Sequence, residues 1–544
     1  MTINSDSAWG GKSANPRATI SGERPYAQVV LTGTLWNYAA SIVVALLQLG
    51  YTAYTGRAVS AADFGAFASA LSTTQLLGYF ANAGLATTVL RSPELTRSLL
   101  MATLRLGVLS GLVCLVVVES TAPFWAELWN APDAEGLLQL LGLQFLFLPL
   151  GAVSTAGLRR LLAQRAAVLV ETGSQAAGLL VGTLLLAAGW NPMGLAATSV
   201  TTQLGIAVLA AALLAGRLPP TSLPPVERRI GFRELASSSG LLAGHQLAQY
   251  LTNTMPLWAA GMLLGPVAAG YYSRATLFTG LLLTMLAAGL TRVTTPALTR
   301  VRVGALKADE LVNTRALRAY EPPAVRRAVT DVLLAGSALS FLPFGLLAGL
   351  GPGALEMLLG PGWTEAAQLV PVLSAFSAAA VLYAVGLSVD TVCGCLRRMA
   401  IAQTAAAVTT LAWAIAGTVG RSVTMLAWSA LAGQLAGLAV QLWMWRSGRV
   451  VEASRLWAGY AVHAILGTTT YAAGVAFSRV ADSGLSAPTL FVLLVVALVV
   501  AGCHSMRRRL PLYQIAVARG LLPVRFLCRS SGRHRGQVTP PKVP

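Results

Sequence analysis

The sequence predicts an all-α integral membrane protein with about fourteen transmembrane helices, built as two parallel-repeat six-helix lobes plus two C-terminal helices. Three observations predict this class: an apolar composition, regularly spaced apolar runs and a one-sided distribution of basic residues. Of the 544 residues, 55% are hydrophobic and only 11% are charged, whereas a soluble chain carries roughly a quarter charged residues. Because so few charges cannot cover a water-exposed surface of this size, most of that surface is predicted to face lipid.

The apolar runs have the length that a membrane requires. A spanning helix needs roughly 20 apolar residues. The predicted spans are 30–54, 66–88, 98–120, 137–158, 166–188, 193–216, 235–261, 268–298, 328–351, 366–392, 399–420, 423–445, 457–478 and 485–505. Prolines inside several of them predict kinks, which membrane helices tolerate when neighbours satisfy the freed carbonyl groups.

The basic residues fix the orientation. The net charge is +19, and if the N-terminus lies inside, most of the 39 Lys and Arg residues fall on the inner side. The outer loops keep Arg57, Arg274, Arg421 and Arg479 beside several acidic residues. A wrong helix count would invert this pattern downstream, and it does not invert. The sequence therefore predicts a multi-pass protein of the plasma (inner) cell membrane with both termini cytoplasmic, and the basic charge needs no nucleic-acid partner.

The apolar runs and the distribution of charge also divide the chain into parts. The predicted parts are a cytoplasmic N-terminal tail (1–29), an N-terminal six-helix lobe (30–216), a cytoplasmic linker (217–234), a C-terminal six-helix lobe (235–446) with a cytoplasmic loop (299–327), helices 13 and 14 (447–506), and a basic cytoplasmic tail (507–544). The first part of this tail is expected to contact anionic membrane lipids.

An internal repeat relates the two lobes. Gly65, Phe67 and Ala70 correspond to Gly270, Tyr272 and Ala275. A second echo is the Leu-Arg-Arg triplet at 158–160 and at 396–398. Six spans separate the members of each pair, and because six is even both lobes have the same orientation. Two parallel repeats that rock about a central cavity are typical of transporters.

No cofactor or metal site is predicted. Cys393 and Cys395 form a Cys-x-Cys motif, but no His or further Cys stands near them in the sequence, so two small packing residues are favoured over zinc ligands. The chain has no Walker motif.

Several motifs resemble one known family. Residues 62–67 (Ala-Asp-Phe-Gly-Ala-Phe) and then 82–91, with Gly-Leu and a closing Arg, stand around the second span. Residues 264–275, residues 296–300 and Trp363 follow in the second lobe. Together these segments, spread over 30–445, resemble the Wzx-type polysaccharide flippases of the multidrug-exporter-like superfamily. Asn253-Thr-Met255 departs from the Asn-x-Asp that family members often carry, which puts ion coupling at that position in doubt.

The resemblance implies a function without bond breaking, so the chain is predicted to be a transporter and not an enzyme. Members of this family are taken to move polyprenyl-diphosphate-linked oligosaccharides from the inner to the outer leaflet by alternating access. The implied partners are this lipid-linked oligosaccharide, membrane lipids, and candidate polysaccharide polymerases and glycosyltransferases.

Polar residues at membrane depth are the candidates for the transport path, because each charge there is costly. Arg274 leads them, since a guanidinium suits a diphosphate; the alternative is an interfacial Arg that reaches outward. The predicted cavity-lining residues are Asn37, Gln75, Asn82, Gln246, Tyr250 and Asn253. The alternative for each of these is a hydrogen-bonding role between helices.

Ion coupling has three candidates, Glu171, Asp390 and His245. The alternatives are structural: ion pairs of the two acids with the nearby pairs Arg159/Arg160 and Arg397/Arg398, and a packed, hydrogen-bonded histidine.

Other functional classes stay open at this point. A small-molecule exporter of the same superfamily predicts acidic residues deep in the first spans, which are absent here. A membrane glycosyltransferase or polysaccharide polymerase usually shows acidic pairs or a long outer loop. A scaffold that recruits partners through cytoplasmic loops would leave the buried polar residues without a role.

Overall fold

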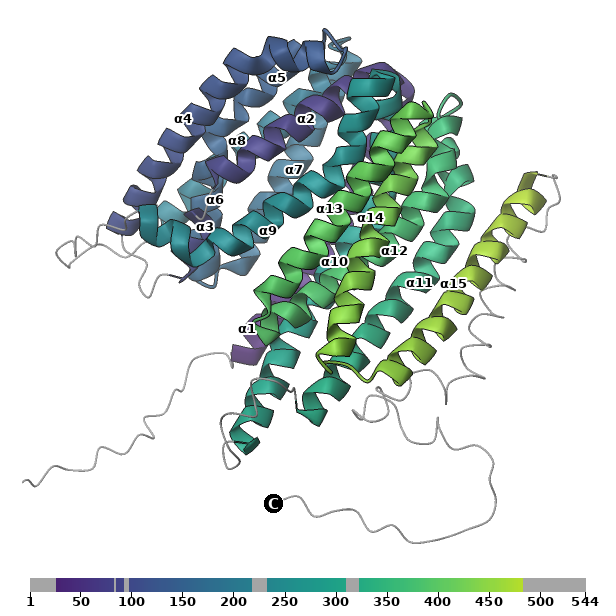
Figure 1. The fold of residues 1–544 in the computed structure, drawn as a ribbon. Helices are drawn as coiled ribbons and strands as arrows, with labels where there is room; N and C mark the ends of the chain where they lie inside the picture. The colour runs from purple at the N-terminus through teal and green to yellow at the C-terminus, as the bar shows by residue number, and fades with distance from the viewer. Residues whose placement is uncertain (1–25, 83–84, 92–96, 218–231, 310–321, 483–544) are drawn as a thin grey trace, which may run out of the picture.

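The structure is a computed structural model that describes residues 26–82, 85–91, 97–217, 232–309 and 322–482 (Figure 1). The predicted span 485–505 and both predicted tails, apart from residues 26–29, lie outside these residues.

Every regular element in the described part is a helix. In the first half these are α1 (Tyr26–Ala58), α2 (Ala61–Ala81), α3 (Leu85–Arg91), α4 (Arg97–Leu128), α5 (Ala134–Gly142), α6 (Gln144–Arg160), α7 (Gln164–Ala187) and α8 (Met193–Ala215). In the second half they are α9 (Phe232–Ala259), the π-helix η1 (Ala260–Leu264), α10 (Pro266–Asp309), α11 (Pro323–Leu359), α12 (Thr364–Cys393), α13 (Leu396–Val419), α14 (Val423–Ser447) and α15 (Ala453–Asp482). Within the described ranges, 10 helical segments are long and apolar enough to cross a membrane. The predicted all-α, multi-pass membrane class is confirmed.

The structure departs from the predicted elements most clearly at three places. The run 66–88 is not one helix, because α2 ends at Ala81 and α3 begins at Leu85. The fourth span is broken at Leu143, between α5 and α6. The predicted cytoplasmic loop 299–327 is partly helical, because α10 continues to Asp309 and α11 begins at Pro323. Charge ends an apolar run but not a helix, since Arg, Lys, Ala and Leu all favour helix.

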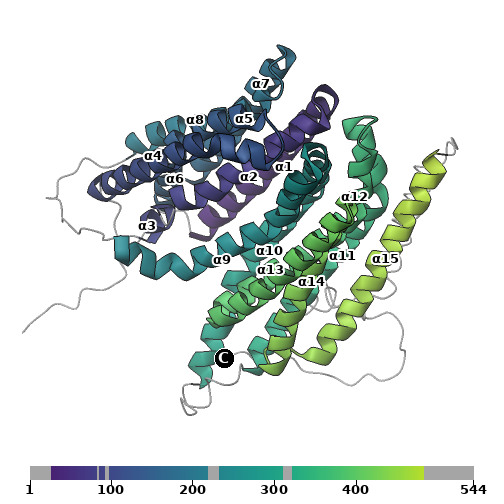
Figure 2. The same cartoon turned by 45° about the horizontal axis from the view of Figure 1, so that its top comes forward.

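The helices gather into two bundles, which we call the N-terminal bundle (α1–α8) and the C-terminal bundle (α9–α15) (Figures 1 and 2). Each bundle has a core of its own. One core lies among α3, α4, α6, α7 and α8 and includes Leu85, Val153 and Leu214. Another lies among α10, α11, α12, α14 and α15 and includes Leu333 and Trp445.

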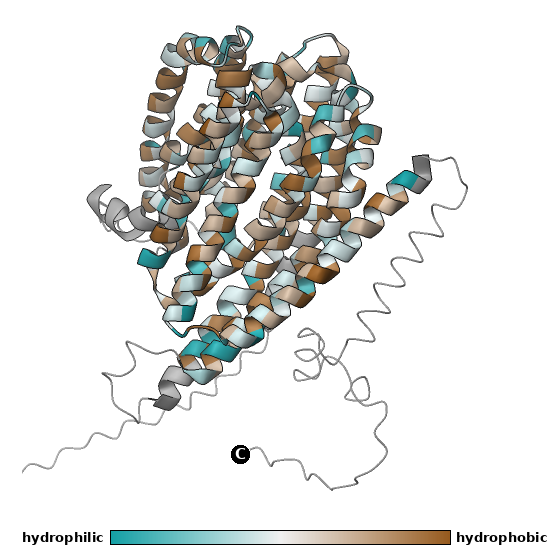
Figure 3. Ribbon diagram, turned by 45° about the vertical axis from the view of Figure 1, so that its right-hand side comes forward, coloured by the Kyte–Doolittle hydropathy of each residue, from teal (hydrophilic) through white to brown (hydrophobic). Residues whose placement is uncertain are grey.

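Apolar residues are spread along the helices of both bundles (Figure 3), and many of their side chains are exposed on the outside. On α4, for example, Leu109, Val113 and Val116 are exposed. A soluble protein buries such residues, so this surface suits a lipid environment.

A third core joins the two bundles. It combines Phe64 and Trp129 of the N-terminal bundle with Tyr272, Leu359 and Trp363 of the C-terminal bundle. These residues lie where α2 and α10 begin and where α4 and α11 end, which charge alternation predicts to be the outer end. The bundles therefore pack together at the predicted outer end.

Two glycines set the distance between α2 and α10 in this core. A Cβ atom at Gly65 would overlap the carbonyl oxygen of Pro266, and a Cβ at Gly270 would overlap the carbonyl oxygen of Ala61. Gly65 and Gly270 are equivalent positions of the repeat, and so are Ala61 and Pro266. The two repeats therefore meet each other symmetrically, and only glycine permits this approach.

The second echo does not share this equivalence. Arg159 and Arg160 lie in the last turn of α6, whereas Arg397 and Arg398 lie in the first turn of α13. The first Leu-Arg-Arg triplet thus lies at the end of a helix, whereas the second lies at the beginning of one.

We expect Gly65→Ala and Gly270→Ala each to lower the thermal melting temperature of the purified protein, because overpacking against rigid backbone costs roughly 1–3 kcal/mol or more. Gly280→Ala on α10 is the matched control, since a Cβ there meets nothing within 4 Å. Equal melting temperatures for all three variants would show that α2 and α10 do not approach so closely.

Candidate functional site

Polar side chains line facing sides of α2 and α9 where the two bundles meet. On α2 the spacing of Gln75, Tyr79 and Asn82 is i, i+4, i+7, and on α9 Gln246, Tyr250 and Asn253 repeat it, so each set lies on one helical face. We call these six residues, with Ser72, the polar seam.

Contacts across the bundles hold the polar seam together. The Tyr250 hydroxyl donates to the carbonyl oxygen of Ser72 at 2.6 Å, and the rings of Tyr79 and Tyr250 are 5.2 Å apart. The indole N–H of Trp258 donates to Ser72 Oγ at 2.9 Å. The structure thus places the predicted Tyr250 of α9 against Ser72 and Tyr79 of α2.

The predicted cavity residues differ in exposure. Gln75, Gln246 and Asn253 are exposed, and Tyr250 is half-buried. Asn82 caps the C-terminal end of α2, and its Oδ1 atom is buried with no hydrogen-bond partner among the described residues. Asn37 lies on α1, and its side chain is outside the description.

Sequence reasoning missed Ser72 and Tyr79, although both lie on the same helical face as Gln75. A helical projection of α2 would have found them, because they stand three residues before and four residues after Gln75.

Arg274 occupies the predicted outer end, on α10, one turn beyond the glycine contact. Its side chain is only 6% exposed, and its guanidinium carbon lies 4.0 Å from the centre of the Phe64 ring. The Phe64 ring contacts Trp363, with centroids 5.6 Å apart, and Trp363 contacts Tyr271 at 5.9 Å. Arg274 is therefore a buried cation under a group of aromatic rings.

No carboxylate balances this cation within the part of the chain that the structure describes. Arg274 Nε is buried and has no hydrogen-bond partner there. The nearby Tyr51 hydroxyl is hydrogen-bonded to Thr198 Oγ1 at 2.9 Å. A cation–π contact offsets about 2 kcal/mol when desolvated, while the burial of an unpaired ion costs several kcal/mol. The guanidinium thus retains unused capacity to bind an anion.

Hydrogen bonds close the same end. The indole N–H of Trp363 donates to the carbonyl oxygen of Gly56 at 2.8 Å, and Arg57 donates to that of Met357 at 3.0 Å. Asn130 donates to the carbonyl oxygen of Met262 at 3.3 Å. Each bond joins one bundle to the other, so this conformation is closed at the predicted outer end.

The ion-coupling candidates have separate surroundings. Glu171 forms the expected ion pair with Arg159, at 2.6 Å between Oε1 and Nη2. Because both side chains are about 40% exposed (41% and 36%), this pair contributes little stability.

The surroundings of Asp390 and His245 differ from those that the structural alternatives predicted. Asp390 is fully buried and accepts hydrogen bonds from the Trp445 indole at 2.8 Å and the Gln441 amide at 2.9 Å. An ion pair of Asp390 with Arg397 or Arg398 is not formed in the described structure, so that expectation was wrong. His245 is buried on α9, and neither ring nitrogen has a hydrogen-bond partner among the described residues. The hydrogen-bonded packing histidine is therefore not what the structure contains.

The described residues contain no group of three His, Cys, Asp or Glu side chains that could hold a metal ion.

Residues 55–318 match the family described as Polysaccharide biosynthesis protein. This segment includes the glycine contact, the polar seam and Arg274. No curated protein sequence matches the chain significantly.

Solved structures share the fold over most of the chain. The lipid II flippase MurJ, in an inward closed conformation, has a TM-score of 0.63 at 10% identity, with 88% of this chain and 99% of that chain covered. An inward-facing multidrug resistance MATE family transporter of the MOP superfamily has 0.53 at 15%, covering 78% and 98%. The MATE multidrug transporter DinF-BH has 0.52 at 14%, covering 78% and 96%.

These findings confirm the predicted resemblance to polysaccharide flippases of the multidrug-exporter-like superfamily. At such identities the solved structures show the shared fold, and the family match adds the link to polysaccharide biosynthesis. Together they show a fold shared with multi-pass membrane transporters and a match to polysaccharide biosynthesis proteins over residues 55–318.

The burial of Arg274 without an anion predicts an unusual stability effect. We expect Arg274→Met to leave the ligand-free protein equally stable or to raise its thermal melting temperature, because burying an unpaired ion costs several kcal/mol and a methionine of similar length would not carry that cost. Arg57→Met is the matched control at the same end, since it removes a hydrogen bond to Met357. A strong loss of stability in Arg274→Met alone would mean that Arg274 is a structural residue.

Proposed function

We propose that this chain moves a polyprenyl-diphosphate-linked oligosaccharide, a repeat unit of a polysaccharide, from the cytoplasmic to the outer leaflet by alternating access of its two bundles. The observation that carries this proposal is Arg274, a buried cation with no carboxylate partner in the described chain, placed where the bundles meet. A diphosphate is the part of such a substrate that a guanidinium binds best.

The conformation suits the first half of a transport cycle. The bundles are closed at the predicted outer end by the core that they share. On the inner side of this core, Gln75, Gln246 and Asn253 are exposed. Amide groups of this kind donate and accept hydrogen bonds, as sugar hydroxyls require. We assign to the polar seam the contact with the glycan.

Arg274 acts later in the proposed cycle. Rocking of the bundles about the α2–α10 contact would separate Phe64 and Trp363 from each other and expose the guanidinium. An arriving diphosphate would then compensate the positive charge that the closed state buries. Binding to the open state more strongly than to the closed state is what allows a ligand to drive such a change.

No bond is broken in this process, so the proposal needs no catalytic group. The plasma-membrane location, the cytoplasmic termini and association with polysaccharide polymerases and glycosyltransferases belong to the same proposal.

Ion coupling through Glu171, Asp390 or His245 stays a prediction. The ion pair of Glu171 and the hydrogen bonds of Asp390 give these two residues structural roles as well.

A reconstituted flipping assay tests the proposal. Full-length protein is placed in vesicles that contain a fluorescent polyprenyl-diphosphate oligosaccharide, and an impermeant quencher reports the fraction that has crossed. We expect Arg274→Ala to slow crossing about tenfold to a hundredfold, since a hydrogen bond to a charged group contributes roughly 1.5–3 kcal/mol. Arg292→Ala, an exposed residue of the same helix, is the matched control and should retain the wild-type rate.

Cells that lack the gene separate the proposal from its competitors. Accumulation of the complete lipid-linked glycan in the inner leaflet supports flipping. Truncated glycan would instead identify an assembly enzyme. Normal glycan combined with new sensitivity to cationic drugs would identify an exporter.

A further inference from the structure

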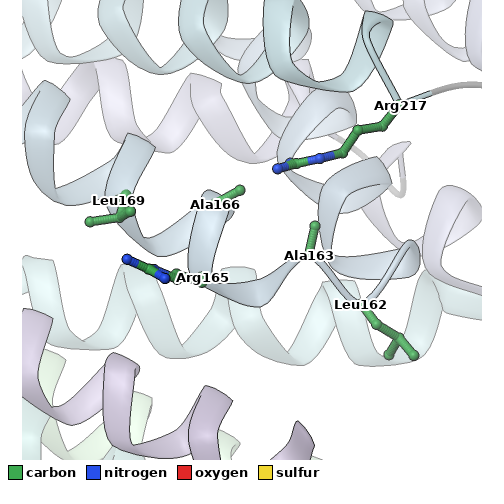
Figure 4. A pocket seen from close by; sticks show the side chains of 6 residues that line it. All are labelled: Leu162, Ala163, Arg165, Ala166, Leu169 and Arg217. Atoms are coloured by element: carbon green, nitrogen blue, oxygen red, sulfur yellow. The ribbon is translucent and has the colours of Figure 1, made fainter. Parts of the chain in front are cut away.

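A pocket outside the bundle junction opens at the predicted inner end of the N-terminal bundle. Its volume is about 370 Å³, and it lies between the α6–α7 turn and the short segment that follows α8. The lining residues are Leu162, Ala163, Arg165, Ala166, Leu169 and Arg217. Figure 4 shows Arg165 and Arg217 entering this region from different segments of the chain.

Among the described residues, no acid balances the positive charge of the pocket. Neither Arg165 nor Arg217 forms an ion pair in the described part of the chain, and the nearby Glu171 is paired with Arg159. Arg165 is instead held 4.7 Å from the centre of the Trp36 ring of α1. No side chain caps the N-terminal end of α7 at Ala163, so the helix dipole adds to the positive potential.

An apolar surface continues from the pocket along α7. The exposed face of this helix bears Leu169, Gly173, Ala177, Leu180 and Leu184. This stripe is about 22 Å long at 1.5 Å per residue, close to the length of an extended acyl chain. A water-filled path would require polar side chains, so this face suits a lipid chain.

We propose that this pocket is a binding site for one anionic phospholipid of the cytoplasmic leaflet. The phosphate contacts the guanidinium groups of Arg165 and Arg217, and an acyl chain lies against Leu169 and the rest of the stripe. Charge complementarity selects an anionic over a zwitterionic lipid, and the stripe selects a lipid over free phosphate. This inference does not depend on the transported substrate.

Native mass spectrometry of the full-length purified protein tests the site. Phosphatidylglycerol and phosphatidylcholine of identical chains are titrated against the wild type and against Arg165→Gln/Arg217→Gln. We expect wild type to prefer phosphatidylglycerol and the double variant to bind it about thirtyfold more weakly, since each basic residue near a membrane surface contributes about a factor of five. Arg165→Lys/Arg217→Lys should retain most of the binding, because it keeps both charges.

The matched control is Arg397→Gln/Arg446→Gln, which removes two exposed charges from the C-terminal bundle and should leave phosphatidylglycerol binding unchanged. Equal loss in this control, or equal affinity of wild type for both lipids, would overturn the proposal. So would displacement of phosphatidylglycerol by inorganic phosphate at similar concentration, which would identify a free-anion site. Displacement by a polyprenyl diphosphate at similar concentration would assign the pocket to the transported lipid and overturn it as well.

Discussion

The close approach of α2 and α10 at Gly65 and Gly270 determines much of the architecture. Because neither residue has a Cβ atom, each helix backbone reaches the other helix at equivalent positions of the repeat. Phe64 precedes the first glycine, and Arg274 stands one helical turn after the second. The cation–π contact between these two side chains, and hence the burial of the charge, therefore follows from the backbone contact.

In the closed conformation, the burial of Arg274 opposes the interactions that hold the two bundles together. Aromatic packing and neutral hydrogen bonds favour closure, whereas an unpaired buried cation disfavours it. An anion that reaches Arg274 would remove the penalty in whichever state admits it. Under the proposed function, the same residue would thus help to open the empty carrier and recognise its cargo, without a second switching element.

The sequence predicted the features that depend on local pattern. Apolar runs identified the spans, and the Gly65/Gly270 echo identified two equivalent positions of the repeat, although not that they meet. Features that depend on distant partners were predicted poorly. Asp390 was matched with Arg397 and Arg398 because they are close in sequence, but its partners Gln441 and Trp445 come from α14. The break at Leu143 and the extension of α10 to Asp309 leave no trace in hydropathy, which reports the solvent and not the hydrogen-bonding pattern of the backbone.

The two roles considered for Tyr250, lining the transport path and hydrogen bonding between helices, need not exclude each other. Its hydroxyl joins α9 to α2 through Ser72, while Gln246 and Asn253 on the same helical face are exposed. A neutral hydrogen bond contributes only about 1 kcal/mol net, so such a bond can specify the closed arrangement and still break during each cycle. A charged pair at this place would hold the bundles more firmly and would compete for an anionic cargo. Under the proposed function, the neutral composition of the polar seam therefore suits a carrier that must reopen.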